Sequence, residues 1–298
     1  MSLEHNKLLC YKQTDIDSHG KLKFFLEKHS TKEGTWGRLF LHEGAIDFAF
    51  LNGLGQECSR TRIDQEHPEF QISPAAWHKI IPVSKSFKAT LEFYCIPHRY
   101  FNKKYGLSAV QSDLVYVYQT YLHHLQEASI LDVGCGSGRN LLYLAKMGYQ
   151  ITGLDNNQSA LETIQEIARK EAFGKVVTQL YDLNQPLKLG VERFDFVLST
   201  VALQFLNSER IPFLLTELQE ATNKNGYHFL VFPIQSELYS LPEFFTYLPN
   251  QEELYHRYQD AGWSILEYKE SVGHLHKQDA SGKQIPGVFG ILLAQKLG

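Results

Sequence analysis

One ten-residue stretch restricts the fold of this chain more than any other. Residues 131–140 read LDVGCGSGRN: an apolar strand ends beside Asp132, three glycines stand at alternate positions, and a helix begins near Asn140. Glycine adopts positive φ at little cost and lets a backbone approach a ligand closely. In an open parallel sheet such a turn lies at the carboxyl ends of the strands, where ligands bind. The stretch therefore predicts a strand–loop–helix unit that carries a ligand site.

The rest of the chain after Ala128 has a matching pattern. Capping residues Ser159 and Glu162 are expected to begin one of its helices. We expect strands at 130–133, 151–154, 176–181, 194–198, 227–232, 265–268 and 288–294, and helices at 140–147, 159–173, 210–221 and 252–261. This alternation predicts an α/β fold, Rossmann-like, with a mostly parallel sheet and helices on both faces.

The first hundred residues have a different pattern. Their short apolar stretches are separated by Gly, Pro, Asn or charged residues, which is typical of a small antiparallel sandwich or barrel. An amphipathic helix at about 108–126 follows, because apolar residues there recur at steps of three and four. We therefore expect an all-β domain at 1–98 and an α/β domain at 99–298 that includes this helix.

Composition excludes several classes of protein. The 29 Lys and Arg against 33 Asp and Glu argue against a dedicated nucleic-acid binder. Four cysteines without a C-x-x-C pair are typical of reduced cytosolic thiols and not of a disulfide framework or zinc site. No apolar run reaches the ~18 residues of a membrane span, and the start lacks an export signal. We expect a cytoplasmic protein without a membrane partner.

The glycine spacing indicates which ligand the loop holds. A dinucleotide loop, G-x-G-x-x-G, does not fit, because position 139 is Arg, and no Walker lysine follows. The pattern D-x-G-x-G-x-G is instead the signature of S-adenosylmethionine enzymes, in which the loop wraps the aminoacyl end of the cofactor. Asp155, at the end of the next strand, is placed to accept the ribose hydroxyls. Asp182 would accept the adenine amino group while Leu183 packs on the ring. The three acidic residues Asp132, Asp155 and Asp182 would also attract the positively charged sulfonium of the cofactor.

The acceptor side carries weaker signals. The motif of amino-methylating DNA enzymes and the acidic pair of arginine methyltransferases are absent, so a small acceptor is favoured. His274 and His276, with Lys277 and Lys283, surround a turn at Gly282. Two histidines on one face of a strand supply only two metal ligands. Three interpretations of this segment remain open: a metal contact, a solvated hairpin, and an edge of the substrate pocket that binds anions.

Residues from about Tyr100 to Gly298 resemble the tellurite-resistance methyltransferases of the TehB type. The resemblance rests on motifs at residues 100–105, 131–140, 199–207, 226–231 and 273–282. It implies a class I methyltransferase fold with a seven-stranded sheet and S-adenosylmethionine as methyl donor. It also implies methylation of tellurite and selenium oxyanions to volatile or less toxic products, which would confer tellurite resistance.

The same resemblance suggests site residues. His276 matches the family's acceptor motif, whereas Lys277 and Gln284 stand where the family has arginines; Lys keeps the charge but lacks the planar fork of Arg. We assign His276 and Lys277 to positioning or neutralising the acceptor, as the catalytic residues. The residues assigned to the cofactor are Tyr105, Asp132, Gly134, Cys135, Gly136, Asn140, Asp155, Asn156, Asp182, Leu183 and Thr200.

The first domain resembles the small cupin-like domain fused to some members, through residues 34–37 and 77–80. Histidines are scattered there, so we expect a barrel without metal, used for packing, homodimer formation or ligand sensing. We expect His78 to be a hydrogen-bonded turn residue. Two alternatives to the oxyanion reaction stay open: methylation of a thiol or other small molecule on the same core, and a sensor that binds S-adenosylmethionine or an anion without catalysis.

Overall fold

A computed structural model describes residues 8–18, 23–278 and 282–298, except for the side chains of Lys23 and of residues 276–278. The chain forms two compact units, Met1–Ala109 and Val110–Gly298. Helix α2 (Tyr100–Tyr105) contacts strand β1 (Leu9–Asp17) and so belongs with the first unit. The boundary expected at 98/99 stays a prediction.

The first unit is built from two antiparallel four-stranded sheets around one core. Its buried residues come from both sheets and include Leu39 and Phe48, both fully buried. This confirms the predicted small all-β domain. One sheet has the order β1-β8-β3-β6 and the other β2-β7-β4-β5, with β2 (His29–Ser30), β3 (Trp36–Glu43), β4 (Ile46–Leu51), β5 (Glu57–Ile63), β6 (Glu69–Ile72), β7 (Trp77–Pro82), β8 (Lys88–Cys95) and the short helix α1 (Lys23–Leu26).

The prediction that His78 lies in a turn is wrong. His78 lies in strand β7, where it is buried and stacks on the Phe48 ring with 4.7 Å between the ring centroids. Its Nδ1 hydrogen-bonds the Ala76 carbonyl at 2.8 Å, and burial lowers the pKa of the ring to about 4. The ring is therefore a neutral core residue. Among the described residues, no group of three or more His, Cys, Asp or Glu side chains could hold a metal.

The second unit is a seven-stranded sheet with the order β11-β10-β9-β12-β13-β15-β14. Its first five strands run parallel, and β15 lies antiparallel between β13 and β14. The predicted class I methyltransferase sheet is confirmed. The strands are β9 (Ser129–Val133), β10 (Gln150–Asp155), β11 (Val176–Leu180), β12 (Phe194–Thr200), β13 (Thr222–Ile234), β14 (Trp263–Gln278) and β15 (Gln284–Lys296).

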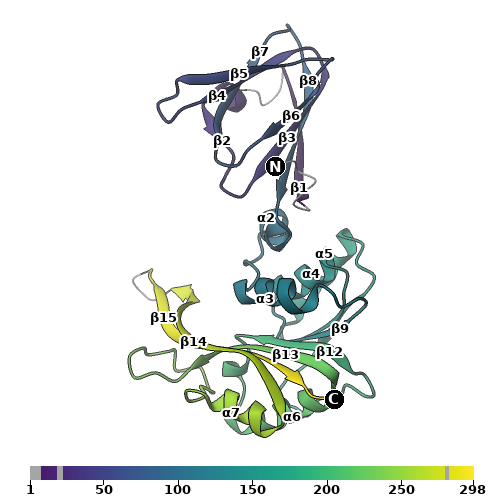
Figure 1. The fold of residues 1–298 in the computed structure, drawn as a ribbon, viewed down its shortest axis with the longest axis vertical. Helices are drawn as coiled ribbons and strands as arrows, with labels where there is room; N and C mark the ends of the chain where they lie inside the picture. Colours follow the sequence, from purple (N-terminus) through teal and green to yellow (C-terminus); the bar gives the residue numbers. More distant parts are fainter. Residues whose placement is uncertain (1–7, 19–22, 279–281) are drawn as a thin grey trace. The chain divides into compact units, whose positions relative to one another are not determined.

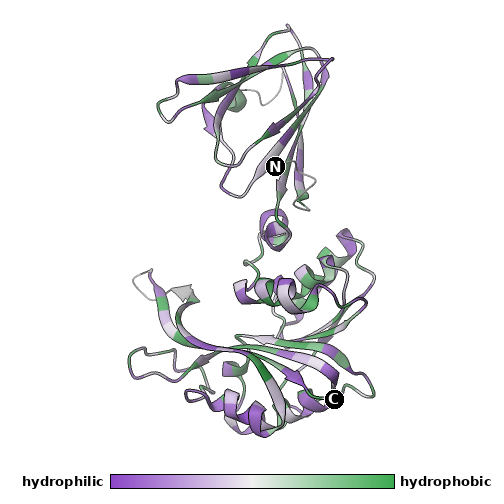
Figure 2. Cartoon of the chain, viewed as in Figure 1, coloured by the Kyte–Doolittle hydropathy of each residue, from purple (hydrophilic) through white to green (hydrophobic). Residues whose placement is uncertain are grey.

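Helices cover both faces of this sheet. Figure 1 shows α3 (Ser112–Val117), α4 (Arg139–Lys146) and α5 (Gln158–Lys170) on one face, and α6 (Ile211–Glu220) and α7 (Glu253–Asp260) on the other. Figure 2 shows apolar residues along the central strands and hydrophilic residues on α7, as expected where helices meet solvent. Helix α3 continues as a π-helical turn to Leu122, a shorter helical segment than the expected 108–126.

The predicted capping box at the start of α5 is wrong. Asn157 is the N-cap, because its Oδ1 accepts a hydrogen bond from Ala160 N at 3.1 Å, whereas Ser159 lies inside the helix. Asn and Ser are about equally good N-caps. The chain uses the earlier residue, so the helix begins closer to the end of β10. None of the described helices is long and apolar enough to cross a membrane.

Candidate functional site

The glycine loop joins β9 to α4 at the point where the strand order reverses, with β10 on one side of β9 and β12 on the other. All three glycines have positive φ: 75° at Gly134, 52° at Gly136 and 82° at Gly138. A Cβ at Gly134 would lie 2.3 Å from Ala202 Cβ, and one at Gly138 would lie 2.6 Å from Ile164. A Cβ at Gly136 would meet nothing within 4 Å. The outer glycines therefore permit close packing, and the middle one faces open space.

Asp132 is the buried acid beneath the loop. Its side chain is 1% exposed, and its Oδ2 has no hydrogen-bond partner among the described residues. Burial raises the pKa of this carboxyl to about 7, although the nearby Arg139 charge acts in the opposite direction. A buried carboxylate oxygen without a donor is costly. A cationic ligand that brings N–H donors would satisfy it.

Asp155 is fixed between the loop and the start of α5. Its Oδ2 accepts from Gly136 N at 2.7 Å, and its Oδ1 accepts from Asn157 N at 2.9 Å. Each carboxylate oxygen has a second lone pair available. The half-buried side chain thus has a defined orientation with acceptor capacity left for a diol, and the neighbouring Asn156 is exposed.

Asp182 follows β11, the outermost parallel strand. Its exposed carboxylate accepts two hydrogen bonds from Asn184, at 3.0 Å from the backbone and 3.1 Å from the side chain, and it lines a pocket of about 470 Å³. Leu183 is buried in the hydrophobic core of the unit. The adenine contacts expected of both residues stay predictions.

Asn140 and Thr200 are brought together by the fold. Asn140 is 2% exposed, donates from Nδ2 to Thr200 Oγ1 at 2.8 Å, and accepts from Gln111 N at 3.1 Å. These bonds tie the start of α4 to the end of β12 and to the residue that caps α3. Gln111 was missed because the sequence predicted it inside a helix at 108–126, whereas in the structure it caps the start of that helix.

The Cys135 side chain is buried against β10, and its role at the cofactor stays a prediction. A Cβ at Gly153 would lie 2.9 Å from its Sγ, and burial raises the pKa of the thiol. Its backbone N–H donates to the Leu154 carbonyl at 3.0 Å. Tyr105 belongs to the first unit, where its ring stacks on Phe101 at 6.0 Å between centroids, and its role at the cofactor stays a prediction.

The two expected catalytic residues lie on the β14–β15 hairpin. The backbones of His276 and Lys277 belong to β14, but their side chains lie outside the described part of the chain, as do residues 279–281. The hairpin pairs Gly273 with Gly287 and closes near Gly282, whose φ is 81°. The predicted turn includes residues outside the described part of the chain, and the acceptor roles stay predictions.

The segment after β12 belongs to the motif at 199–207, but the sequence assigned no role to its residues Val201, Ala202 and Gln204. Val201 has a φ of 57°, which is rare for a β-branched residue, and its N–H donates to the Val231 carbonyl at 2.7 Å. Ala202 then covers Gly134, and Gln204 is buried in the next turn. Strained backbone of this kind concentrates at ligand sites.

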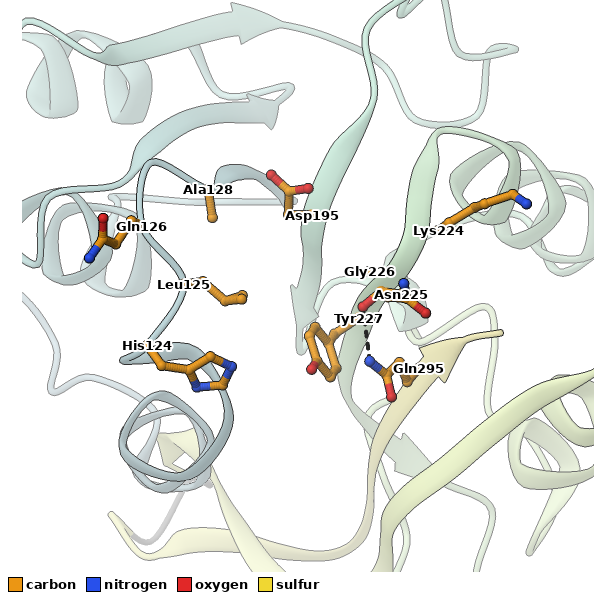
Figure 3. A pocket seen from close by; sticks show the side chains of 10 residues that line it. All are labelled: His124, Leu125, Gln126, Ala128, Asp195, Lys224, Asn225, Gly226, Tyr227 and Gln295. Carbon is orange, nitrogen blue, oxygen red and sulfur yellow. Dashed lines mark hydrogen bonds between the residues drawn. The ribbon is translucent and has the colours of Figure 1, made fainter. Parts of the chain in front are cut away.

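A second pocket, of about 400 Å³, lies at the opposite edge of the sheet (Figure 3). Asp195 in this pocket accepts from Ser129 N at 2.8 Å and from Asn223 Nδ2 at 2.7 Å, so it joins the beginnings of three strands. The pocket is lined by His124, Leu125, Gln126, Ala128, Asp195, Lys224, Asn225, Gly226, Tyr227 and Gln295. Because these residues, except Gln295 in the antiparallel strand β15, precede or begin the parallel strands, the pocket is separate from the glycine loop.

Known proteins resemble the chain over both units. Residues 93–293 match the family described as tellurite resistance protein TehB, and residues 22–91 match the TehB-like domain. A TehB protein of Haemophilus influenzae (strain 10810), described as a probable S-adenosyl-L-methionine-dependent methyltransferase, is 37% identical over 292 residues, which is 98% of this chain and 99% of that protein.

Two further relatives extend the comparison. The crystal structure of TehB from Haemophilus influenzae superposes with a TM-score of 0.91 at 35% identity, covering 98% of this chain and 99% of that one. Hemagglutinin 1 of Eikenella corrodens is 32% identical over 76% of this chain and 73% of its own length. The similarity to the Haemophilus proteins covers the glycine loop, the strand ends and the hairpin together.

Proposed function

The chain belongs to the TehB family of tellurite resistance proteins, and from that premise we propose that this S-adenosylmethionine-dependent methyltransferase acts on a small chalcogen oxyanion such as tellurite or selenite. The observation that carries the proposal is the family match over residues 93–293, which includes the hairpin with His276 and Lys277. The small size expected of the acceptor agrees with the absence of motifs for nucleic-acid or arginine substrates.

The residues at the carboxyl edge fit S-adenosylmethionine. The orphaned Oδ2 of Asp132 needs a donor, and the aminoacyl end of the cofactor carries an ammonium. Open space at Gly136 lets a ligand approach the backbone of the loop. Asp155, already oriented by two backbone N–H groups, would accept the ribose hydroxyls, and Asp182 the adenine amino group. The cofactor supplies a methyl group on a positively charged sulfur.

The chain's own contribution to the reaction is position and electrostatics. Asn140 and Thr200 hold the loop against the end of β12. Asp155 and Asp182 at the strand ends would stabilise the positive charge of the bound donor. On the acceptor side, His276 and Lys277 would bind an oxyanion and neutralise part of its charge. Lys277 would do so as a point charge and not as the bidentate fork of an arginine.

Release of S-adenosylhomocysteine tests the proposal. We expect the wild-type protein to release it with tellurite and selenite, and His276→Ala to lose most of that activity while binding S-adenosylmethionine normally in calorimetry. Turnover with organic thiols and none with either oxyanion would instead support a thiol methyltransferase. Cofactor binding without release for any acceptor would support a sensor.

A further inference from the structure

Gln204 presents an unusual buried group. Its side chain is 1% exposed, and its Oε1 has no hydrogen-bond partner among the described residues. Its Nε2 donates to the Val201 carbonyl at 2.8 Å. That bond identifies which side-chain atom is the nitrogen, because the flipped amide would place Gln204 Oε1 against the Val201 carbonyl oxygen. A buried amide oxygen left without a donor costs about 1–3 kcal/mol, so the group calls for a functional explanation.

The position of Gln204 relates it to the acceptor side of the site. It lies in the turn Leu203–Phe205 directly after β12, two residues beyond Ala202, whose Cβ covers Gly134. The strands that lead to Asp155 and Asp182, β10 and β11, lie on the other side of β9. Gln204 therefore closely follows the residue that packs on the glycine loop, on the side of β9 away from the strand ends expected to hold adenosine.

Two contacts join this turn to the hairpin. Thr246, in the loop after β13, donates its N–H to the Gln204 carbonyl at 2.8 Å and its hydroxyl to the Leu206 carbonyl at 2.7 Å. In the same loop, Leu241 packs against β15: its Cδ2 would lie 2.7 Å from a Cβ at Gly287. Gly287 pairs with Gly273, three residues before His276. The loop after β13 thus contacts both the turn and the hairpin, and we call these three segments the rim.

We propose that Gln204 Oε1 accepts a hydrogen bond from a hydroxyl of the acceptor, so that the enzyme selects the oxyanion in its singly protonated form. This inference rests on the proposed function. An amide oxygen only accepts hydrogen bonds, so its partner must carry a donor. A fully deprotonated dianion carries none and would be repelled by the amide oxygen, whereas a monoanion with one O–H satisfies it.

The protonation state agrees with the chemistry of transfer. The lone pair on selenium or tellurium forms the new bond to the methyl carbon, and the electron pair of the broken carbon–sulfur bond returns to sulfur. A monoanion and a sulfonium thereby give two products without net charge at the reacting centres, and the hydroxyl proton stays in place. No base is required to remove it, so a neutral amide suffices.

Substitution of Gln204 tests the inference. Gln204→Met keeps the length of the side chain and removes the amide, and Gln204→Glu keeps an acceptor oxygen but adds a charge that repels the anion. With Gln204→Met we expect kcat/KM for selenite to fall roughly tenfold or more, mainly through KM. Calorimetric binding of selenite to the enzyme loaded with S-adenosylhomocysteine should weaken by the same factor. Gln204→Glu should lose more. The affinity for S-adenosylmethionine should not change.

An aryl selenolate, which has no hydroxyl, is the matched acceptor. Its methylation rate should be the same in wild type and Gln204→Met. Equal losses with both acceptors would show a merely structural role and overturn the inference, as would weaker cofactor binding with unchanged selenite binding. If the wild-type protein methylated selenite but Gln204→Met did so equally well, this inference alone would fail. If the wild type neither bound nor methylated any oxyanion, the proposed function would fail with it.

Discussion

The two halves of the seven-stranded sheet differ in how their ligand groups are assembled. On the β10–β11 side, the loop and Asp155 contact each other directly, and short sequence-local patterns specify both. On the β12–β15 side, the rim combines a turn, a long loop and a hairpin that are distant in the sequence. The half proposed to hold the cofactor is therefore readable as a motif, whereas the half proposed to hold the acceptor depends on tertiary structure.

The largest expected effect on stability is that of a substitution at Gly138, the glycine of the loop that packs against Ile164. Gly138→Ala should lower the free energy of unfolding by about 2–4 kcal/mol, because its Cβ would meet Ile164 at 2.6 Å and its φ is 82°. Gly136→Ala meets no atom within 4 Å, so only its positive φ should cost about 1–2 kcal/mol. Denaturant unfolding of both variants measures the difference. Equal stabilities would contradict the packing role of Gly138.

Asp132→Asn should have opposite effects on stability and on binding. Burial raises the pKa of Asp132 to about 7 in the folded chain, from about 4 when unfolded. Between these values the folded state holds the extra proton, so stability falls as pH rises toward 7. At pH 8, Asp132→Asn should stabilise the ligand-free protein by about 1–3 kcal/mol and weaken cofactor binding. Thermal unfolding at pH 5 and pH 8 tests this, and a gain that is the same at both would count against it.

Asp155→Ala should weaken S-adenosylmethionine binding by more than about 1 kcal/mol, because an oriented charged acceptor is lost. Isothermal calorimetry measures this. Ser159→Ala is the control, since its side chain is exposed and no cofactor role is assigned to it. An unchanged affinity in Asp155→Ala would remove the ribose assignment and, with it, much of the contrast between the two halves.

The smallest effect concerns the start of α5. Asn157→Ala should destabilise the protein by about 1 kcal/mol, because the N-cap acceptor for Ala160 N is lost. Ser159→Ala should change stability by only a few tenths, since Ser159 lies within the helix. If Ser159→Ala destabilised the protein more than Asn157→Ala in chemical denaturation, the result would support the capping box expected from the sequence.

The fold was largely predictable because the periodic and alternating patterns of the second unit extend over whole elements. The glycine loop and Asp155 were also predictable, since each ends a strand in a repeated arrangement. Gln204 was not, because a buried polar side chain in an irregular turn carries no periodic signal and acquires its environment only from distant segments. Gln111 was not, because its bond to Asn140 joins residues 29 positions apart in the sequence. His78 was predicted to lie in a turn because the pairing of its strand with β2 and β4 depends on segments distant in the sequence.

The most direct test is a crystal structure of the protein with S-adenosylhomocysteine and selenite. We expect the nucleoside against the glycine loop, its ribose on Asp155, and the selenite between Gln204 and the β14–β15 hairpin, with one oxygen within hydrogen-bond distance of Gln204 Oε1. An adenosyl ligand in the pocket around Asp195, or selenite bound away from the rim after β12, would contradict the account.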